Sequence, residues 1–200
     1  MNKKTKKPLK RRTKKKIFRK RTKLKDILPI NVENELLLSR TLFLSNAIDE
    51  KSATKLIKEI LVLERLNNKL PILLWINSPG GYVNEGYAII NTFRAVKSKI
   101  ITVINGEACS MASIIASCGD ERCITVNSWW MGHDMTASIV DYSRKIESRA
   151  KMIKRLWEQL ERTLIQHTKL SKEDLLELRN GELWLSAEEA VAKGVVDRVV

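Results

Sequence analysis

The hydrophobic pattern between residues 41 and 118 alternates between short apolar runs and amphipathic segments. It predicts strands at residues 41–45, 71–76 and 99–105, and the last two are continuous apolar runs, as expected where both faces of a sheet are covered. It predicts helices at residues 50–66, 84–97 and 111–118, the first of them capped by Asp49. This order of elements predicts an α/β fold with largely parallel strand pairing.

Beyond residue 118 the pattern predicts three more strands, at residues 122–125, 129–133 and 195–200. A long helix is predicted at residues 140–167, where charged side chains recur at i,i+4 spacing. Ser171 and Ser186 each begin a capping box that opens a shorter helix, and the second of these helices is expected to end at Gly194.

The positive charge is concentrated at the N-terminus. The 200 residues carry a net charge of +14, but residues 1–25 hold fifteen Lys and Arg and no acid, which leaves 22 basic against 23 acidic residues elsewhere. We expect a disordered basic tail at residues 1–25 and one folded domain at residues 26–200. The tail can bind nucleic acid or another polyanion, serve as a cleaved or targeting segment, or remain a solvated extension without a specific partner.

The composition indicates a chain without a membrane span, a metal site or a cofactor. No apolar run is long enough to cross a bilayer, so we expect a cytoplasmic protein, or one of an equivalent reducing compartment. Cys109, Cys118 and Cys123 are odd in number and lack the paired spacing of a zinc site, so we expect three buried thiols.

Ser110 is the first candidate for chemistry, because it lies where the strand that ends at Asn105 turns into the helix that begins at Met111. The first N–H groups of a helix have no internal acceptors, and together with the helix dipole they can stabilise an oxyanion beside a serine hydroxyl. The alternative is an ordinary N-cap serine.

Gly80 and Gly81 follow another predicted strand, at the edge of the sheet where open α/β folds bind ligands. The N–H groups of Gly81 and Met111 can form a pair of oxyanion donors around Ser110, although a plain turn explains the glycines equally well. The spacing fits neither a Walker motif nor G-x-G-x-x-G, so a phosphate loop is excluded.

Two histidines are available as a general base. His133 ends a predicted strand and can face the same crevice as Ser110. His167 lies near the end of a helix, where the dipole favours a cation, and a structural role is equally open for His133.

Four motifs in chain order resemble the Clp protease proteolytic subunit family, the ClpP-like serine peptidases. They are Asn77-Ser-Pro-Gly-Gly81, Ala108-Cys-Ser-Met-Ala112, Met131-Gly-His133 and Leu185-Ser-Ala-Glu-Glu-Ala190. The resemblance runs from about Arg40 to the C-terminus. It implies a ClpP/crotonase-type fold of repeated strand–strand–helix units with a long protruding handle helix.

The resemblance also implies a function: hydrolysis of peptide bonds by a serine endopeptidase inside stacked homo-oligomeric rings. Carried over by position, Ser110 is the nucleophile, His133 the general base, and Gly81 and Met111 the oxyanion donors. The acid that orients the base is usually aspartate in the family, and the matching position here holds Glu182. Asp174 and Glu177 are weaker candidates for this role.

Other departures bear on partners and on the exact activity. Residues 28–40 are too few for the N-terminal hairpin that contacts an ATP-dependent Clp unfoldase in familiar members, so the sequence also fits a phage-type head-maturation protease that needs no ATPase. The segment between Ser110 and His133 is slightly shorter than in familiar bacterial members of the family. Asp134-Met135 replaces the family's usual residues directly after the histidine, a difference expected to change the substrate cleft. Further alternatives are a catalytically inactive ring subunit, a nucleic-acid-binding protein acting through its tail, and a crotonase-type acyl-CoA enzyme.

Overall fold

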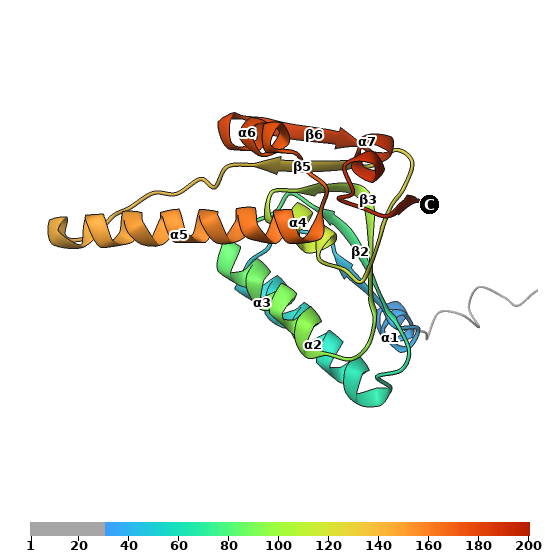
Figure 1. Cartoon of the computed structure of the whole chain (residues 1–200). Coiled ribbons are helices and arrows are strands. Elements are labelled where there is room, and N and C mark those ends of the chain that lie inside the picture. The colour runs from blue at the N-terminus through green and yellow to red at the C-terminus, as the bar shows by residue number, and fades with distance from the viewer. Residues whose placement is uncertain (1–30) are drawn as a thin grey trace, which may run out of the picture.

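A computed structural model describes residues 31–200, which form a mainly parallel sheet with helices packed against it (Figure 1). The strands are β1 (Thr41–Leu44), β2 (Ile72–Ser78), β3 (Ile100–Cys109), β4 (Glu121–Ile124), β5 (Trp129–His133), β6 (Glu182–Ser186) and β7 (Arg198–Val199). The helices are α1 (Val32–Leu38), α2 (Glu50–Leu66), α3 (Val83–Ala95), α4 (Met111–Ser117), α5 (Ser143–His167), α6 (Lys172–Asn180) and α7 (Ala187–Ala192). The expected basic tail and its boundary at residue 25 lie outside the described residues.

The strands pair in the order β1-β2-β3-β4-β7, all parallel, which confirms the predicted α/β class. Strand β5 pairs with the end of β3, and β6 pairs antiparallel with β5. The sequence pattern did not predict β6. Its alternation is nevertheless visible, since Leu183 and Leu185 are buried while Trp184 between them is half-exposed.

Strand β3 does not end at Asn105, as the turn-forming residues there predict, but continues to Cys109. Gly106 makes this possible: its φ is +110°, and a Cβ on it would lie 2.5 Å from Asn77 Oδ1, the atom that accepts the Glu107 N–H. Residues before this bend pair with β4 and residues after it pair with β5. The bend therefore carries β3 from the main sheet to the strand that holds His133.

Trp130 joins β5 to helix α4 in the core. Its side chain is fully buried, and its indole N–H lies 3.1 Å from both the Ser113 carbonyl and the Ser117 hydroxyl. Because Trp130 stands three residues before His133 and α4 begins one residue after Ser110, this contact fixes the two candidate residues relative to one another.

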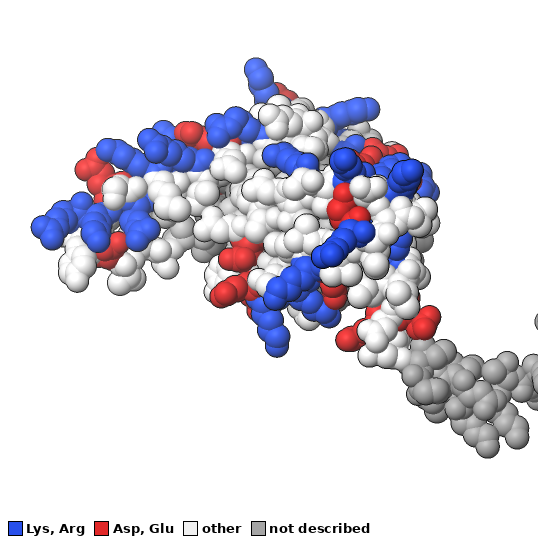
Figure 2. Space-filling model, turned by 90° about the horizontal axis from the view of Figure 1, so that it is seen from below, with Lys and Arg blue, Asp and Glu red and all other residues white. Residues whose placement is uncertain are grey.

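Helix α5 is the long handle expected from the sequence, and its N-terminal half extends beyond the sheet and the other helices (Figure 1). Only its C-terminal half is packed, through Trp157, Leu160 and Leu164. The helix carries seven Lys and Arg against three Glu, and Figure 2 shows basic side chains gathered on its protruding end. It begins at Ser143, not at Val140, because the Asp141 carboxylate accepts the Tyr142 backbone N–H and the Arg149 Nε–H in a non-helical turn.

The C-terminal elements follow the predicted caps. Capping boxes open α6 at Ser171 and α7 at Ser186, and Gly194 follows α7 with a φ of +61°. The predicted strand at 195–200 shortens to β7, since Val195 and Val196 are buried in the core beside α7. Across residues 31–200, no helix combines the length and the apolar character needed to span a membrane.

Candidate active site

Ser110 stands between β3 and α4 in a strained conformation. Its φ is +54° and its ψ is −126°, a region that residues other than glycine rarely adopt. Its N–H donates to the Met131 carbonyl at 2.9 Å, and its own carbonyl accepts the Ser113 hydroxyl at 2.6 Å. Although Ser110 occupies the N-cap position, its hydroxyl makes no capping hydrogen bond. The backbone is thus held rigidly while the hydroxyl remains available.

The loop after β2 approaches Ser110 closely because residue 80 is glycine. A Cβ on Gly80 would lie 2.7 Å from Ser110 Cβ and 3.0 Å from the Met111 nitrogen. Ile48 anchors the loop, since its N–H donates to the Gly80 carbonyl and its carbonyl accepts the Tyr82 N–H, each at 2.8 Å.

This bonding pattern leaves the Gly81 N–H unused. Within residues 31–200 neither the Gly81 N–H nor the Met111 N–H has a hydrogen-bond acceptor, and both residues line the same cavity as Ser110. The structure therefore brings the two predicted oxyanion donors to the predicted nucleophile.

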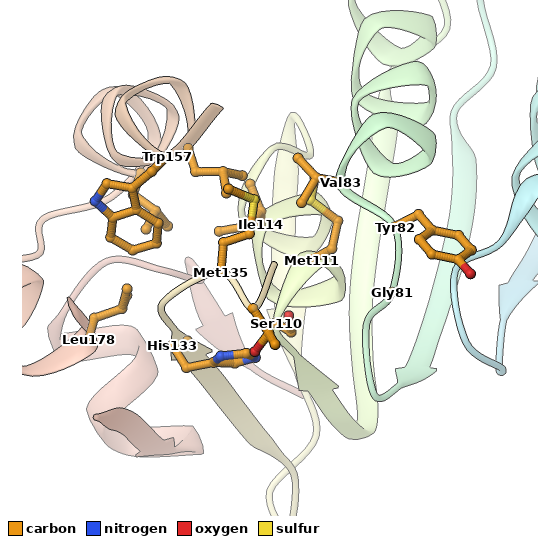
Figure 3. A pocket seen from close by; sticks show the side chains of 14 residues that line it. Gly81, Tyr82, Val83, Ser110, Met111, Ile114, His133, Met135, Trp157 and Leu178 are labelled. Atoms are coloured by element: carbon orange, nitrogen blue, oxygen red, sulfur yellow. The ribbon is translucent and has the colours of Figure 1, made fainter. Parts of the chain in front are cut away.

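His133 ends β5, and its half-buried side chain points toward Ser110 across the cavity (Figure 3). No hydrogen bond joins the two side chains in the described part of the chain, which is common before substrate closes a site. Among the described residues His133 is the one histidine that lines this cavity.

His167 has a structural environment at the end of α5. Burial, with Arg94 and Arg122 close by, lowers the pKa of this imidazole, so the cation expected from the helix dipole is disfavoured. Its carbonyl accepts a hydrogen bond from the Arg122 guanidinium, which also binds Asp197 and the Gly194 carbonyl. This cluster ties the C-terminus to the end of α5.

Glu182 lies directly opposite His133 in the antiparallel register of β5 and β6. Its side chain is exposed, and Oε2 accepts a hydrogen bond from Trp184 Nε1 at 2.8 Å. No hydrogen bond reaches from Glu182 to His133 within residues 31–200. The register thus places the two residues side by side, without a hydrogen bond between their side chains.

Asp174 and Glu177, the weaker candidates for the acid, lie on α6. Burial would raise the pKa of Asp174, but hydrogen bonds from Lys193 at 2.7 Å and from the Ser171 N–H hold this pKa below its ordinary value. The Asp174 carboxylate therefore caps α6 and forms an ion pair with Lys193. Glu177 is exposed, and its carbonyl accepts the Gly181 N–H at the end of the helix.

A cavity of about 240 Å³ opens beside Ser110 and His133. Its walls are largely apolar and come from several elements: Val83, Ile114, Met135, Trp157, Leu160, Leu164 and Leu178. The sequence pattern did not predict that α5 forms one wall of the cavity, although Trp157, Leu160 and Leu164 follow i, i+3, i+7 spacing. Met135, one of the two residues that depart from the family pattern after His133, lines the cleft.

The three cysteines are not alternative nucleophiles. Burial raises the pKa of the Cys109 thiol to about 12, helped by the charges of Glu107 and Glu182, and burial raises the pKa of Cys118 to about 12 as well. All three thiols are free, and within residues 31–200 no group of His, Cys, Asp and Glu could hold a metal ion.

We expect Cys109 to resist alkylation near neutral pH, because only the thiolate reacts. With a pKa of about 12, the thiolate fraction at pH 8 is about 10⁻⁴, roughly a thousandfold below that of a thiol with the ordinary value of 9.0. Iodoacetamide at pH 8 should leave the peptide that contains Cys109 unmodified, and the activity unchanged, over an hour. Rapid alkylation of Cys109 with loss of activity would contradict this assignment.

Comparison with known proteins gives a consistent result. The model of the Clp protease family matches residues 25–200. The chain is 31% identical over 172 residues to the ATP-dependent Clp protease proteolytic subunit of Deinococcus radiodurans, covering 85% of this chain and 84% of that protein. It is 33% identical over 168 residues to proteolytic subunit 1 of Streptomyces avermitilis, covering 83% and 77%. It is 31% identical over 182 residues to proteolytic subunit 1 of Chlamydia trachomatis, covering 89% and 93%.

Proposed function

The chain belongs to the Clp protease family, and from this premise we propose that it is a serine endopeptidase that hydrolyses peptide bonds inside a ring-shaped oligomer. Ser110 is the nucleophile, His133 is the general base, and Glu182 is the acid that orients the base. The N–H groups of Gly81 and Met111 bind the oxyanion. The supporting observation is the strained Ser110, whose free hydroxyl faces His133 and two unpartnered N–H groups around one cavity.

The reaction uses these groups in a fixed order. His133 takes the hydroxyl proton as Ser110 Oγ attacks the peptide carbonyl, and the negative charge that develops on the carbonyl oxygen is stabilised by the two backbone N–H groups. The tetrahedral intermediate collapses when His133 returns the proton to the leaving amine. Water, deprotonated by the same imidazole, then hydrolyses the acyl-enzyme and restores Ser110.

The apolar cavity beside Ser110 would hold the substrate side chain that precedes the scissile bond. Burial of a Leu- or Met-sized side chain is worth about 1.5–3 kcal/mol, and the walls offer no charged partner for an ionic side chain. We therefore expect fluorogenic peptides with Leu, Met or Phe at this position to have kcat/KM values on the order of 10–100-fold above those with Asp or Lys. Faster cleavage after Asp or Lys would contradict the assignment of the cavity.

On the basis of family membership, we propose that the chain assembles into homo-oligomeric rings and that two rings stack through α5. Its protruding half exposes Ile146 and Met152 among basic residues. Association with an ATP-dependent Clp unfoldase and activity without an ATPase stay alternative predictions; helix α1 at residues 32–38, where a hairpin strand would contact the unfoldase, favours the second. Phage-type head maturation, polyanion binding by residues 1–25 and a cytoplasmic location also stay predictions.

A second candidate function is an inactive ring subunit that supports an active paralogue. The observation that favours it is Glu182, which replaces the usual aspartate and makes no hydrogen bond to His133 within residues 31–200. A crotonase-type acyl-CoA enzyme is less well supported, since its chemistry would not require Ser110 to face His133. Imaging and a peptidase assay on the purified homo-oligomer separate these functions: unaided cleavage of small peptides excludes the inactive subunit.

A further inference from the structure

We infer that Trp184 is a positioning residue for the active site: its indole N–H holds the Glu182 carboxylate in place to orient His133. This inference rests on the proposed function. It starts from the hydrogen bond between Trp184 Nε1 and Glu182 Oε2, which is 2.8 Å long and leaves the second carboxylate oxygen, Oε1, without a partner among the described residues. A carboxylate has two acceptor oxygens, so one can bind the indole while the other accepts an imidazole N–H.

The strand register puts Glu182, Trp184 and His133 on one face of the β5–β6 pair. Glu182 is directly opposite His133, and residues directly opposite in antiparallel strands have Cβ atoms about 5 Å apart on the same face. Trp184 follows Glu182 by two positions and therefore points to the same side. The indole lies beside the carboxylate as a consequence of this alternation.

The charge of Glu182 also reaches the end of β3. It contributes, after burial and Glu107, to the raised pKa of Cys109, the residue immediately before Ser110. The carboxylate therefore lies within electrostatic reach of the nucleophile's own strand.

A hydrogen-bond donor is needed here because glutamate is longer than aspartate. The additional methylene adds a side-chain torsion, and each free torsion must be ordered before the carboxylate can orient an imidazole. The indole N–H removes this freedom. Trp129 supports the indole in turn: the ring centroids of Trp129 and Trp184 lie 6.4 Å apart in an edge-on arrangement at 76°.

The test is the kinetics of Trp184→Phe in the full-length protein, with Trp75→Phe as the matched control. Phenylalanine keeps an aromatic ring but removes the N–H, so we expect kcat to fall about tenfold while KM stays within about twofold. Trp75→Phe removes an indole from β2 that does not line the cavity, and should leave kcat within about twofold. Values of kcat are expressed per Ser110 that a fluorophosphonate labels to completion, so that loss of folded protein does not affect them.

A double-mutant cycle separates positioning from a structural role. If Trp184 acts through Glu182, adding Trp184→Phe to Glu182→Gln should change kcat by less than about twofold. Multiplicative effects of the two changes, or an unchanged or higher kcat in Trp184→Phe alone, would overturn the inference. Loss of turnover in Ser110→Ala together with an unaffected Glu182→Gln would overturn the roles of Trp184 and Glu182 and leave the serine endopeptidase activity standing. Normal turnover in Ser110→Ala would refute the proposed function itself.

Discussion

Replacing Ser110 with alanine is expected to lower kcat for peptide hydrolysis by about 10⁶-fold, to the level that binding and the oxyanion donors alone can provide. The reason is that Ser110 Oγ is the atom that forms the acyl-enzyme, and the thiol of neighbouring Cys109 has a pKa of about 12, so it cannot take over. Initial rates with a fluorogenic peptide that carries leucine before the scissile bond give the comparison.

The control for this change is Ser138→Ala, on the exposed segment before α5 and outside the cavity. It should retain the wild-type rate within about twofold, as surface substitutions usually do. Circular dichroism and the elution volume on size exclusion should be the same for both variants and the wild type. Turnover by Ser110→Ala at a tenth of the wild-type rate or more would be incompatible with a serine nucleophile at this position.

Replacing Glu182 with glutamine is expected to lower kcat by about 10²–10⁴-fold with little change in KM. Glutamine has the same length but no charge to stabilise the imidazolium of His133, and its amide can favour the wrong tautomer of that ring. Because Glu182 is exposed and is the first residue of β6, we expect the fold to be retained.

Glu177→Gln is the matched control, since Glu177 is an equally exposed glutamate five residues earlier and one of the alternative candidates for the acid. It should have wild-type kinetics. A large effect of Glu177→Gln with none for Glu182→Gln would exchange the roles of these two residues. If neither change affects kcat, His133 works without a carboxylate from this part of the chain.

Where chemistry is local, the sequence predicts the structure well. Asp49, Ser171 and Ser186 cap their helices as their spacing indicates, and the parallel sheet follows from alternating strand and helix patterns. The position of Ser110 between a strand and a helix was predictable for the same reason: apolar β-branched residues precede it and small residues follow it.

Features that depend on tertiary contacts were not predictable in this way. The sequence at Gly106 predicts a turn that ends the strand. In the structure the backbone there packs against the Asn77 side chain, and β3 continues toward β5. The apolar wall of the cavity includes Trp157, 47 residues beyond Ser110, because α5 folds back across α4. The strained backbone of Ser110 is likewise held by the hydrogen bond from its N–H to the Met131 carbonyl on β5, which no local pattern encodes.

The pairing of Glu182 with His133 was predictable only in part from the sequence. Resemblance to the family places an acid at this position, but only the antiparallel register of β5 and β6 shows that the two residues lie side by side. The hydrogen bond from Trp184 to Glu182 could not be expected from either source, because β6 itself was not predicted.

The central claim is that Ser110 is an activated nucleophile, and covalent labelling tests it most directly. The purified full-length protein is treated with a fluorophosphonate probe at neutral pH, and the modified residue is located by peptide mass spectrometry. We predict one phosphonyl group per chain on Ser110, with the label absent from Ser110→Ala and strongly slowed in His133→Ala. An unlabelled protein that still cleaves peptides, or labelling at another serine that survives Ser110→Ala, would contradict the account.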